Sequence, residues 1–128
     1  MTLTETIKKW VEIFNLANPE ALSEFYSEDA INHQVANKAV KGKAAIKKMF
    51  EDEFKLAKMV CIIDTIFEAE DRAVLEWKDP DGLKGCGIFE FEKADEYAGK
   101  YGRKIKYQRG YWDKLSFLKI HKLPIIID

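Results

Sequence analysis

The stretch MVCIIDTIFEAE, residues 59–70, marks the point where the apolar pattern of the chain changes its period. It is rich in β-branched residues and alternates in polarity, which is typical of a strand. Before it, apolar residues recur every three to four positions, as on amphipathic helices. After it, the alternating pattern continues to residue 112. The sequence therefore predicts helices first and a sheet second.

Three helices are predicted before this stretch. The first covers residues 3–16, and its apolar stripe is Leu3, Ile7, Trp10, Val11 and Phe14. A short second helix has Asn18 as its predicted N-cap and Pro19 as its first residue. The third covers residues 43–58. A short strand, residues 27–35, and a loop, residues 37–42, separate the second helix from the third.

Further strands are predicted at residues 71–79, 83–93 and 104–112, followed by a closing helix at 113–122 and an extended tail. Turn-forming sequences join the strands, and residues 94–103 make a longer polar hairpin loop. This order predicts an α+β fold, with three N-terminal helices on one face of a mainly antiparallel sheet. The length of 128 residues suits one domain over residues 1–128.

Composition excludes several classes of protein. A formal charge of −1 gives no basic footprint for nucleic acid. No apolar run approaches the roughly 20 residues of a membrane span, and the N-terminus has no signal-peptide core. Two histidines and two separated cysteines give no metal-ligand spacing. We expect a cytoplasmic protein that binds no metal, nucleic acid or membrane.

The strands predict a cavity. Residues 59–67 are apolar at both parities, which indicates that both faces of the sheet are covered. Helices would cover one face, and a partner copy or the tail would cover the other. Gly85, Gly87 and Gly110 fall inside predicted strands, where glycine marks a bend, a bulge or a close approach. A sheet bent around helices leaves a conical cavity, the default place for a ligand.

Three stretches occur in a familiar order: FNLANPEALSEFY (14–26), SEDAINH (27–33) followed by VKGKAAI (40–46), and KIKYQRGYWDKL (104–115). Together they resemble the SnoaL-like branch of the nuclear transport factor 2 superfamily. The resemblance implies a cone-shaped α+β fold with a strongly curved sheet and a homodimer. The superfamily includes polyketide cyclases, isomerases, epoxide hydrolases, dehydratases and non-catalytic binding proteins, so the fold alone selects no activity.

The resemblance also implies site residues. Asp113 matches the general acid/base of the cyclases, and His33 matches a histidine that lines their pocket. Burial among aromatic residues would raise the pKa of Asp113 toward neutrality, whereas an N-cap of the last helix is the alternative role. His33 is either a hydrogen-bond partner of the substrate or a structural histidine. Apart from the resemblance, positions in the predicted strands and helices indicate further ligand contacts: Gln108, Arg109, Tyr111, Trp77, Tyr26 and Trp10, with core packing as the alternative for the aromatic residues.

The predicted function is therefore a small-molecule pocket protein whose ligand is apolar or contains a carbonyl. If it is catalytic, Asp113 exchanges a proton at the carbon next to the carbonyl while His33, Gln108 and Tyr111 orient the substrate or the oxyanion. That chemistry needs no cofactor. The alternative is a non-catalytic ligand-binding or dimeric interaction module of the same fold. The face of the last strand that lines the cavity depends on Gly110 and stays open.

Overall fold

The computed structural model describes residues 1–93 and 99–126. Its helices are α1 (Leu3–Asn15), α2 (Pro19–Ser23), α3 (Lys43–Leu56) and α4 (Lys114–Ile120). Its strands are β1 (Tyr26–Gln34), β2 (Val40–Lys41), β3 (Ile62–Ala69), β4 (Arg72–Lys78), β5 (Lys84–Phe91) and β6 (Ile105–Trp112). The predicted α+β class, with a curved sheet and a short C-terminal helix, is confirmed.

Local sequence explains where the helices begin. Thr2 and Glu5 form a capping box at the start of α1. The Asn18 side chain accepts a hydrogen bond from the Ala21 N–H, and Pro19 is the first residue of α2, as predicted. Gly42 precedes α3 with φ of 93°, a left-handed conformation that glycine adopts without strain.

The six strands form one sheet in the order β2-β1-β6-β5-β4-β3. All neighbours are antiparallel except β1 and β6, which pair in parallel. One prediction was wrong: Val40 and Lys41, expected in a loop, pair with Asn32 and Ile31 as an edge strand. Strand β3 also begins at Ile62 rather than at Met59.

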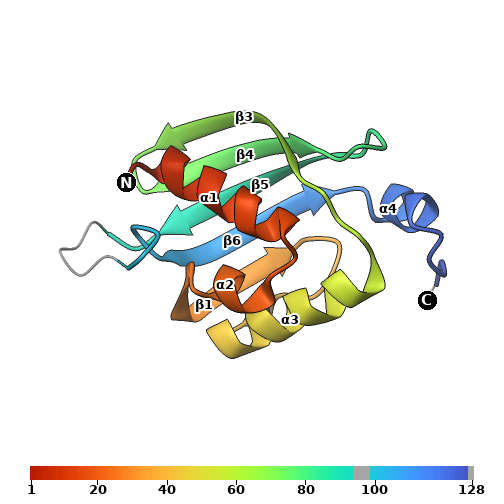
Figure 1. Cartoon of the computed structure of the whole chain (residues 1–128), viewed down its shortest axis with the longest axis horizontal. Helices are drawn as coiled ribbons and strands as arrows, with labels where there is room; N and C mark the ends of the chain where they lie inside the picture. Colours follow the sequence, from red (N-terminus) through yellow and green to blue (C-terminus); the bar gives the residue numbers. More distant parts are fainter. Residues whose placement is uncertain (94–98, 127–128) are drawn as a thin grey trace.

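One face of the sheet packs against α1, α2 and α3, while α4 lies at the end where β6 finishes (Figure 1). We call the helix-covered face the inner face and the opposite one the outer face. The inner face and the helices form the core, in which Ile7, Leu22, Ile46, Phe89 and Phe91 are almost fully buried. Part of the predicted 94–103 loop, residues 94–98, lies outside the described residues. No helix of the described chain is long and apolar enough to cross a membrane.

Candidate functional site

A cavity of about 360 Å³ opens between the inner face of the sheet, α1, α3 and α4. Aromatic side chains make up much of its wall. Trp10 and Phe14 of α1 stack at 5.2 Å between ring centroids, and Phe50 of α3 lies edge-on to both. On the α4 side, the ring centroids of Trp112 and Phe117 lie 5.3 Å apart. The remaining aromatic side chains of the wall are Trp77 and Phe89.

Two glycines make room for side chains of this wall. A Cβ atom on Gly85 would lie 2.2 Å from the Trp77 ring, and one on Gly110 would lie 1.9 Å from the Gln34 Oε1 atom. Real Cβ atoms do not approach other atoms so closely. The close approach predicted from these interior glycines is therefore confirmed at both positions.

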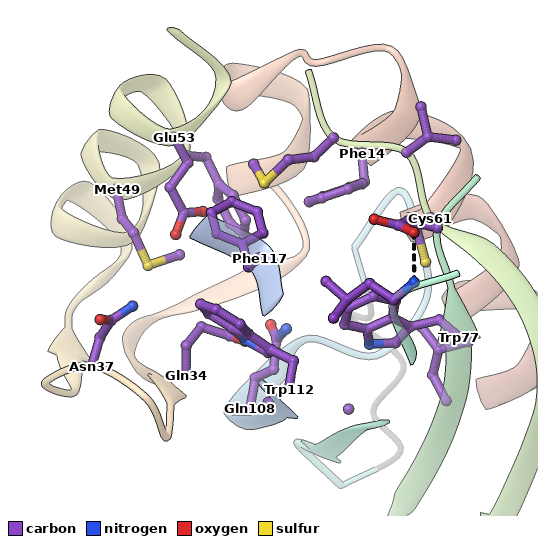
Figure 2. Close-up of a pocket in the computed structure, with 18 of the residues that line it drawn as sticks. Phe14, Gln34, Asn37, Met49, Glu53, Cys61, Trp77, Gln108, Trp112 and Phe117 are labelled. Carbon is purple, nitrogen blue, oxygen red and sulfur yellow. Dashed lines mark hydrogen bonds between the residues drawn. The ribbon is translucent and has the colours of Figure 1, made fainter. Parts of the chain in front are cut away.

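A chain of amide groups crosses the inner face from Trp112 to Gln108. The Trp112 indole N–H donates to Gln34 Oε1 at 2.9 Å, and Gln34 Nε2 donates to Asn32 Oδ1 at 2.8 Å. Asn32 Nδ2 then donates to Gln108 Oε1 at 3.2 Å. We call Gln34, Asn32 and Gln108 the amide chain. Figure 2 shows Gln34, Gln108 and Trp112 together in the wall of the cavity.

Two indole groups fix the direction of these hydrogen bonds. An indole N–H can only donate, so the contact with Trp112 requires the oxygen of Gln34, and each amide then donates to the next. From the other end, the Trp10 indole donates to the Tyr26 hydroxyl at 3.1 Å, and that hydroxyl donates to Gln108 Oε1. Gln108 Oε1 thus accepts two hydrogen bonds, and its oxygen is oriented away from the cavity.

The Gln108 NH2 group is left without a partner among the described residues. Gln108 is only 4% exposed, and it lines the cavity. No fully buried side-chain nitrogen or oxygen lacks a partner in the described part of the chain, so this NH2 group reaches the space of the cavity. The wall therefore offers an unused hydrogen-bond donor to an acceptor atom inside the cavity.

A carboxyl group enters the cavity from α3. Glu53 is partly buried, and its side chain is directed inward on the side where Met49 and Phe117 also lie (Figure 2). No cation pairs with it among the described residues. Burial raises the pKa of Glu53 to about 7, and the charge of Asp52 adds to the rise. At neutral pH this carboxyl group is close to half ionised.

Asp113 occupies a different position from the one expected of a buried acid. It is the exposed N-cap of α4, accepting hydrogen bonds from the Leu115 N–H at 3.2 Å and the Ser116 hydroxyl at 2.6 Å. These bonds, with that from Ser116 the larger cause, lower the pKa of Asp113. The predicted rise in its pKa was wrong, because the chain turns outward directly after β6. Asp113 is not among the residues that line the cavity.

His33, Arg109 and Tyr111 lie on the outer face. His33 pairs with Arg109 across β1 and β6, and Arg109 Nη1 lies 3.3 Å from Glu90 Oε2. Tyr111 is 45% exposed. None of the three lines the cavity, because Gln108, Gly110 and Trp112 are the inward residues of β6.

Three predicted contacts line the cavity, and a fourth, Tyr26, does not reach it. Trp10, Trp77 and Gln108 line it, and Tyr26 is buried behind the wall as the partner of Gln108. Burial is the main cause that raises the pKa of Tyr26, so its hydroxyl stays protonated.

Within the described part of the chain, no group of three or more metal-ligating side chains comes together. The cavity also contains Asp79, but its carboxylate accepts from the Asp81 and Leu83 N–H groups at 2.9 and 2.8 Å. Asp79 therefore stabilises the turn between β4 and β5.

The sequence matches a known family, and the fold is similar to those of solved structures. The model of the SnoaL-like domain family matches residues 7–96. A search of curated proteins finds no match. Among solved structures, an NTF2-like protein of unknown function from Cytophaga hutchinsonii superposes with a TM-score of 0.73 at 15% identity, over 92% of this chain and 96% of that one.

Two further structures share the fold. A hypothetical protein with a ketosteroid isomerase-like fold from Catenulispora acidiphila, in complex with trimethylamine, gives a TM-score of 0.76 at 14% identity over 94% of each chain. Bal32a, from a soil-derived mobile gene cassette, gives 0.70 at 18% identity over 88% of this chain and 90% of that one. At these identities the likeness concerns the fold alone.

Proposed function

The chain belongs to the SnoaL-like domain family, whose fold suggests a small-molecule binding domain, and we propose that it binds a small organic molecule in the cavity of its inner face. The observation that carries the proposal is the Gln108 NH2 group, which has no protein partner among the described residues and borders an aromatic cavity. The volume of about 360 Å³ falls within the range of ligand pockets, roughly 300–1,000 Å³. The Catenulispora structure, which contains trimethylamine, is a precedent for a small ligand on this fold.

The predicted ligand is mostly apolar and carries one acceptor oxygen, such as a carbonyl, for Gln108. Its binding can be followed directly, because all three tryptophans of the chain line the cavity. We expect acetophenone to change the tryptophan fluorescence and to bind about tenfold more tightly than α-methylstyrene, in which a methylene group replaces the carbonyl oxygen. One hydrogen bond to a buried donor, about 1.4 kcal/mol, accounts for this ratio. Equal affinities, or no fluorescence change with either compound, would contradict the proposal.

A second candidate function is proton transfer at the carbon next to a carbonyl. It is favoured by Glu53, because a carboxyl group with a pKa of about 7 can both accept and release a proton near neutrality. Gln108 would donate to the oxygen on which negative charge develops. Glu53 takes the acid/base role here rather than Asp113, whose exposed carboxylate caps α4.

The second candidate is tested by hydrogen–deuterium exchange at the methyl group of acetophenone, followed by proton NMR. We expect exchange above the buffer rate with the native protein and with Asp113→Asn, and the buffer rate with Glu53→Gln. Exchange that survives Glu53→Gln would refute the assignment of the base.

We also propose that the outer face pairs two copies of the chain. It carries exposed Phe67, 55% accessible, and Tyr111, beside the ion pairs of Glu90 with Arg72 and Arg109. Analytical ultracentrifugation is expected to give twice the chain mass for the native protein and one chain mass for Phe67→Glu. A native monomer at 100 micromolar would contradict this interface.

A further inference from the structure

The cavity contains a negative group that no protein cation neutralises among the described residues. Of the basic side chains at its rim, Lys114 donates to Asn37 Oδ1 at 2.8 Å, and His121 packs on Phe117 with ring centroids 4.6 Å apart. Neither forms an ion pair with Glu53. An ionised carboxylate in apolar surroundings is destabilised unless a positive charge lies close to it. The ligand can supply that charge.

The surroundings of Glu53 favour an organic cation over a metal ion. A metal ion needs several oxygen, nitrogen or sulfur ligands, and the second carboxylate of the cavity, Asp79, already accepts two backbone hydrogen bonds. The wall instead presents aromatic rings, among them Trp10, Phe50 and Phe117. The faces of such rings attract alkylammonium groups, by about 2 kcal/mol when the group is desolvated.

A second polar group restricts the chemical class of the ligand further. The Gln108 NH2 group points into the same cavity, and its direction is fixed by the hydrogen bonds of the amide chain. It can donate to an acceptor atom on the ligand. Figure 2 shows that Glu53 enters from α3, whereas Gln108 enters from the sheet, so the two groups belong to different walls.

From these contacts we propose that the ligand is a small organic ammonium ion that also carries an acceptor oxygen. Its positive group lies between the Glu53 carboxylate and the aromatic rings, and its oxygen accepts from Gln108. This inference rests on the ligand-binding function proposed above. It assigns Glu53 as a counter-ion, whereas the proton-transfer candidate assigns it as a base.

The proposal has a definite pH dependence. Only the ionised form of Glu53 attracts a cation, so affinity falls as the pH falls through about 7. For a permanently charged ligand, affinity is expected to fall about tenfold between pH 8 and pH 6. The other titratable groups that line the cavity are Asp79, Cys61, Lys114 and His121, and Tyr26 and Asp52 lie close to Glu53. A His121→Gln variant separates the contribution of the histidine from that of Glu53.

The experiment compares choline with 3,3-dimethylbutan-1-ol, in which a neutral carbon replaces the quaternary nitrogen. Binding is measured by isothermal titration calorimetry and tryptophan fluorescence at pH 8 and pH 6. The native protein is compared with Glu53→Gln and with Glu51→Gln. Glu51 lies on the same helix outside the cavity, so its variant makes the same change of net charge.

At pH 8 we expect choline to bind the native protein and Glu51→Gln at least tenfold more tightly than the neutral alcohol. In Glu53→Gln this preference is expected to fall below about threefold, and the pH dependence of choline binding is expected to disappear. In His121→Gln both the preference and the pH dependence should remain.

Two results would overturn the inference. If choline and the alcohol bind the native protein equally, or if Glu53→Gln keeps the preference for choline, Glu53 is not a counter-ion. Binding of acetophenone with no binding of choline would also overturn it while leaving the proposed function intact. Failure of all three compounds to bind would overturn the function and the inference together.

Discussion

Replacing Glu53 with glutamine is expected to stabilise the protein at alkaline pH. The pKa of this carboxyl group is raised from 4.5 to about 7, mainly by burial. A raised pKa means that the fold is most stable below pH 4.5, where the group is neutral in both states, and loses stability as the pH rises through 7. Each pKa unit is worth about 1.4 kcal/mol, so the ionised carboxylate costs about 3 kcal/mol at pH 8. That figure is an upper value, because part of the side chain contacts water.

Glutamine keeps the shape of the side chain and removes its charge. The free energy of unfolding of Glu53→Gln should therefore exceed that of the native protein by up to about 3 kcal/mol at pH 8, but by no more than about 1 kcal/mol at pH 5. Urea unfolding followed by far-ultraviolet circular dichroism measures both differences. The control Glu51→Gln is expected to change stability by less than about 0.5 kcal/mol at either pH. A Glu53→Gln variant no more stable than the native protein at pH 8 would show that the carboxylate is well hydrated and would refute the reasoning.

Three further perturbations test the site and its supports. Gly110→Ala places a methyl group 1.9 Å from the Gln34 oxygen, so it should displace that amide and weaken acetophenone binding. The two lost hydrogen bonds should lower the free energy of unfolding in urea by about 2 kcal/mol, and an unchanged affinity would contradict the role of the amide chain. Asp113→Asn should leave the acetophenone affinity measured by fluorescence unchanged, because Asp113 lies outside the cavity. A tenfold loss of affinity would show that Asp113 belongs to the site. Asn15→Ala removes two hydrogen bonds to the Cys61 backbone, at 2.9 and 2.7 Å, and should lower the thermal midpoint by the equivalent of about 2 kcal/mol. An unchanged midpoint would show that water replaces these two hydrogen bonds.

The fold was predictable from the sequence because its elements differ in period. The apolar stripe from Leu3 to Phe14 lies on α1. The alternating pattern after Ile62 lies in β3 and the strands that follow it. The short strand at Val40 was missed because a strand of two residues is too short to show an alternating apolar pattern. Its pairing with β1 depends on contacts between segments, which local propensity does not contain.

The site was predicted less well, because it depends on the face of the strand to which each side chain points and on where the chain turns after the strand. Residues 108 and 109 are neighbours in the chain, yet one lies in the cavity and the other on the outer face. Asp113 follows the strand by one residue, where the chain turns into α4 and parity no longer applies. His33 was placed in the site by resemblance to a family, and Tyr111 by its shared parity with Asp113, which itself lies outside the cavity.

Signals for the missed residues were present. Glu53 follows Met49 by four positions and Phe50 by three, so it lies on the apolar stripe of α3, an unusual place for a carboxylate. Asn32 has the same parity as buried Ala30, which marks it as an inward polar group of β1. A polar residue within an apolar stripe was therefore a better indicator of the cavity than a match to the family acid.

The position of β6 in the sheet has a consequence for the synthesis of the chain. Of the six described strands, β6 leaves the ribosome last, yet it lies between β1 and β5. Until it is made, the β1–β2 pair and the β3–β4–β5 meander are separate sheets, and each has an open edge that invites pairing with other chains. The parallel partners Tyr26 and Ile105 are far apart in the sequence, so closing the sheet requires a long loop and is expected to limit the folding rate. A nascent chain truncated before residue 105 should consequently bind chaperones and aggregate, and release of β6 should end both.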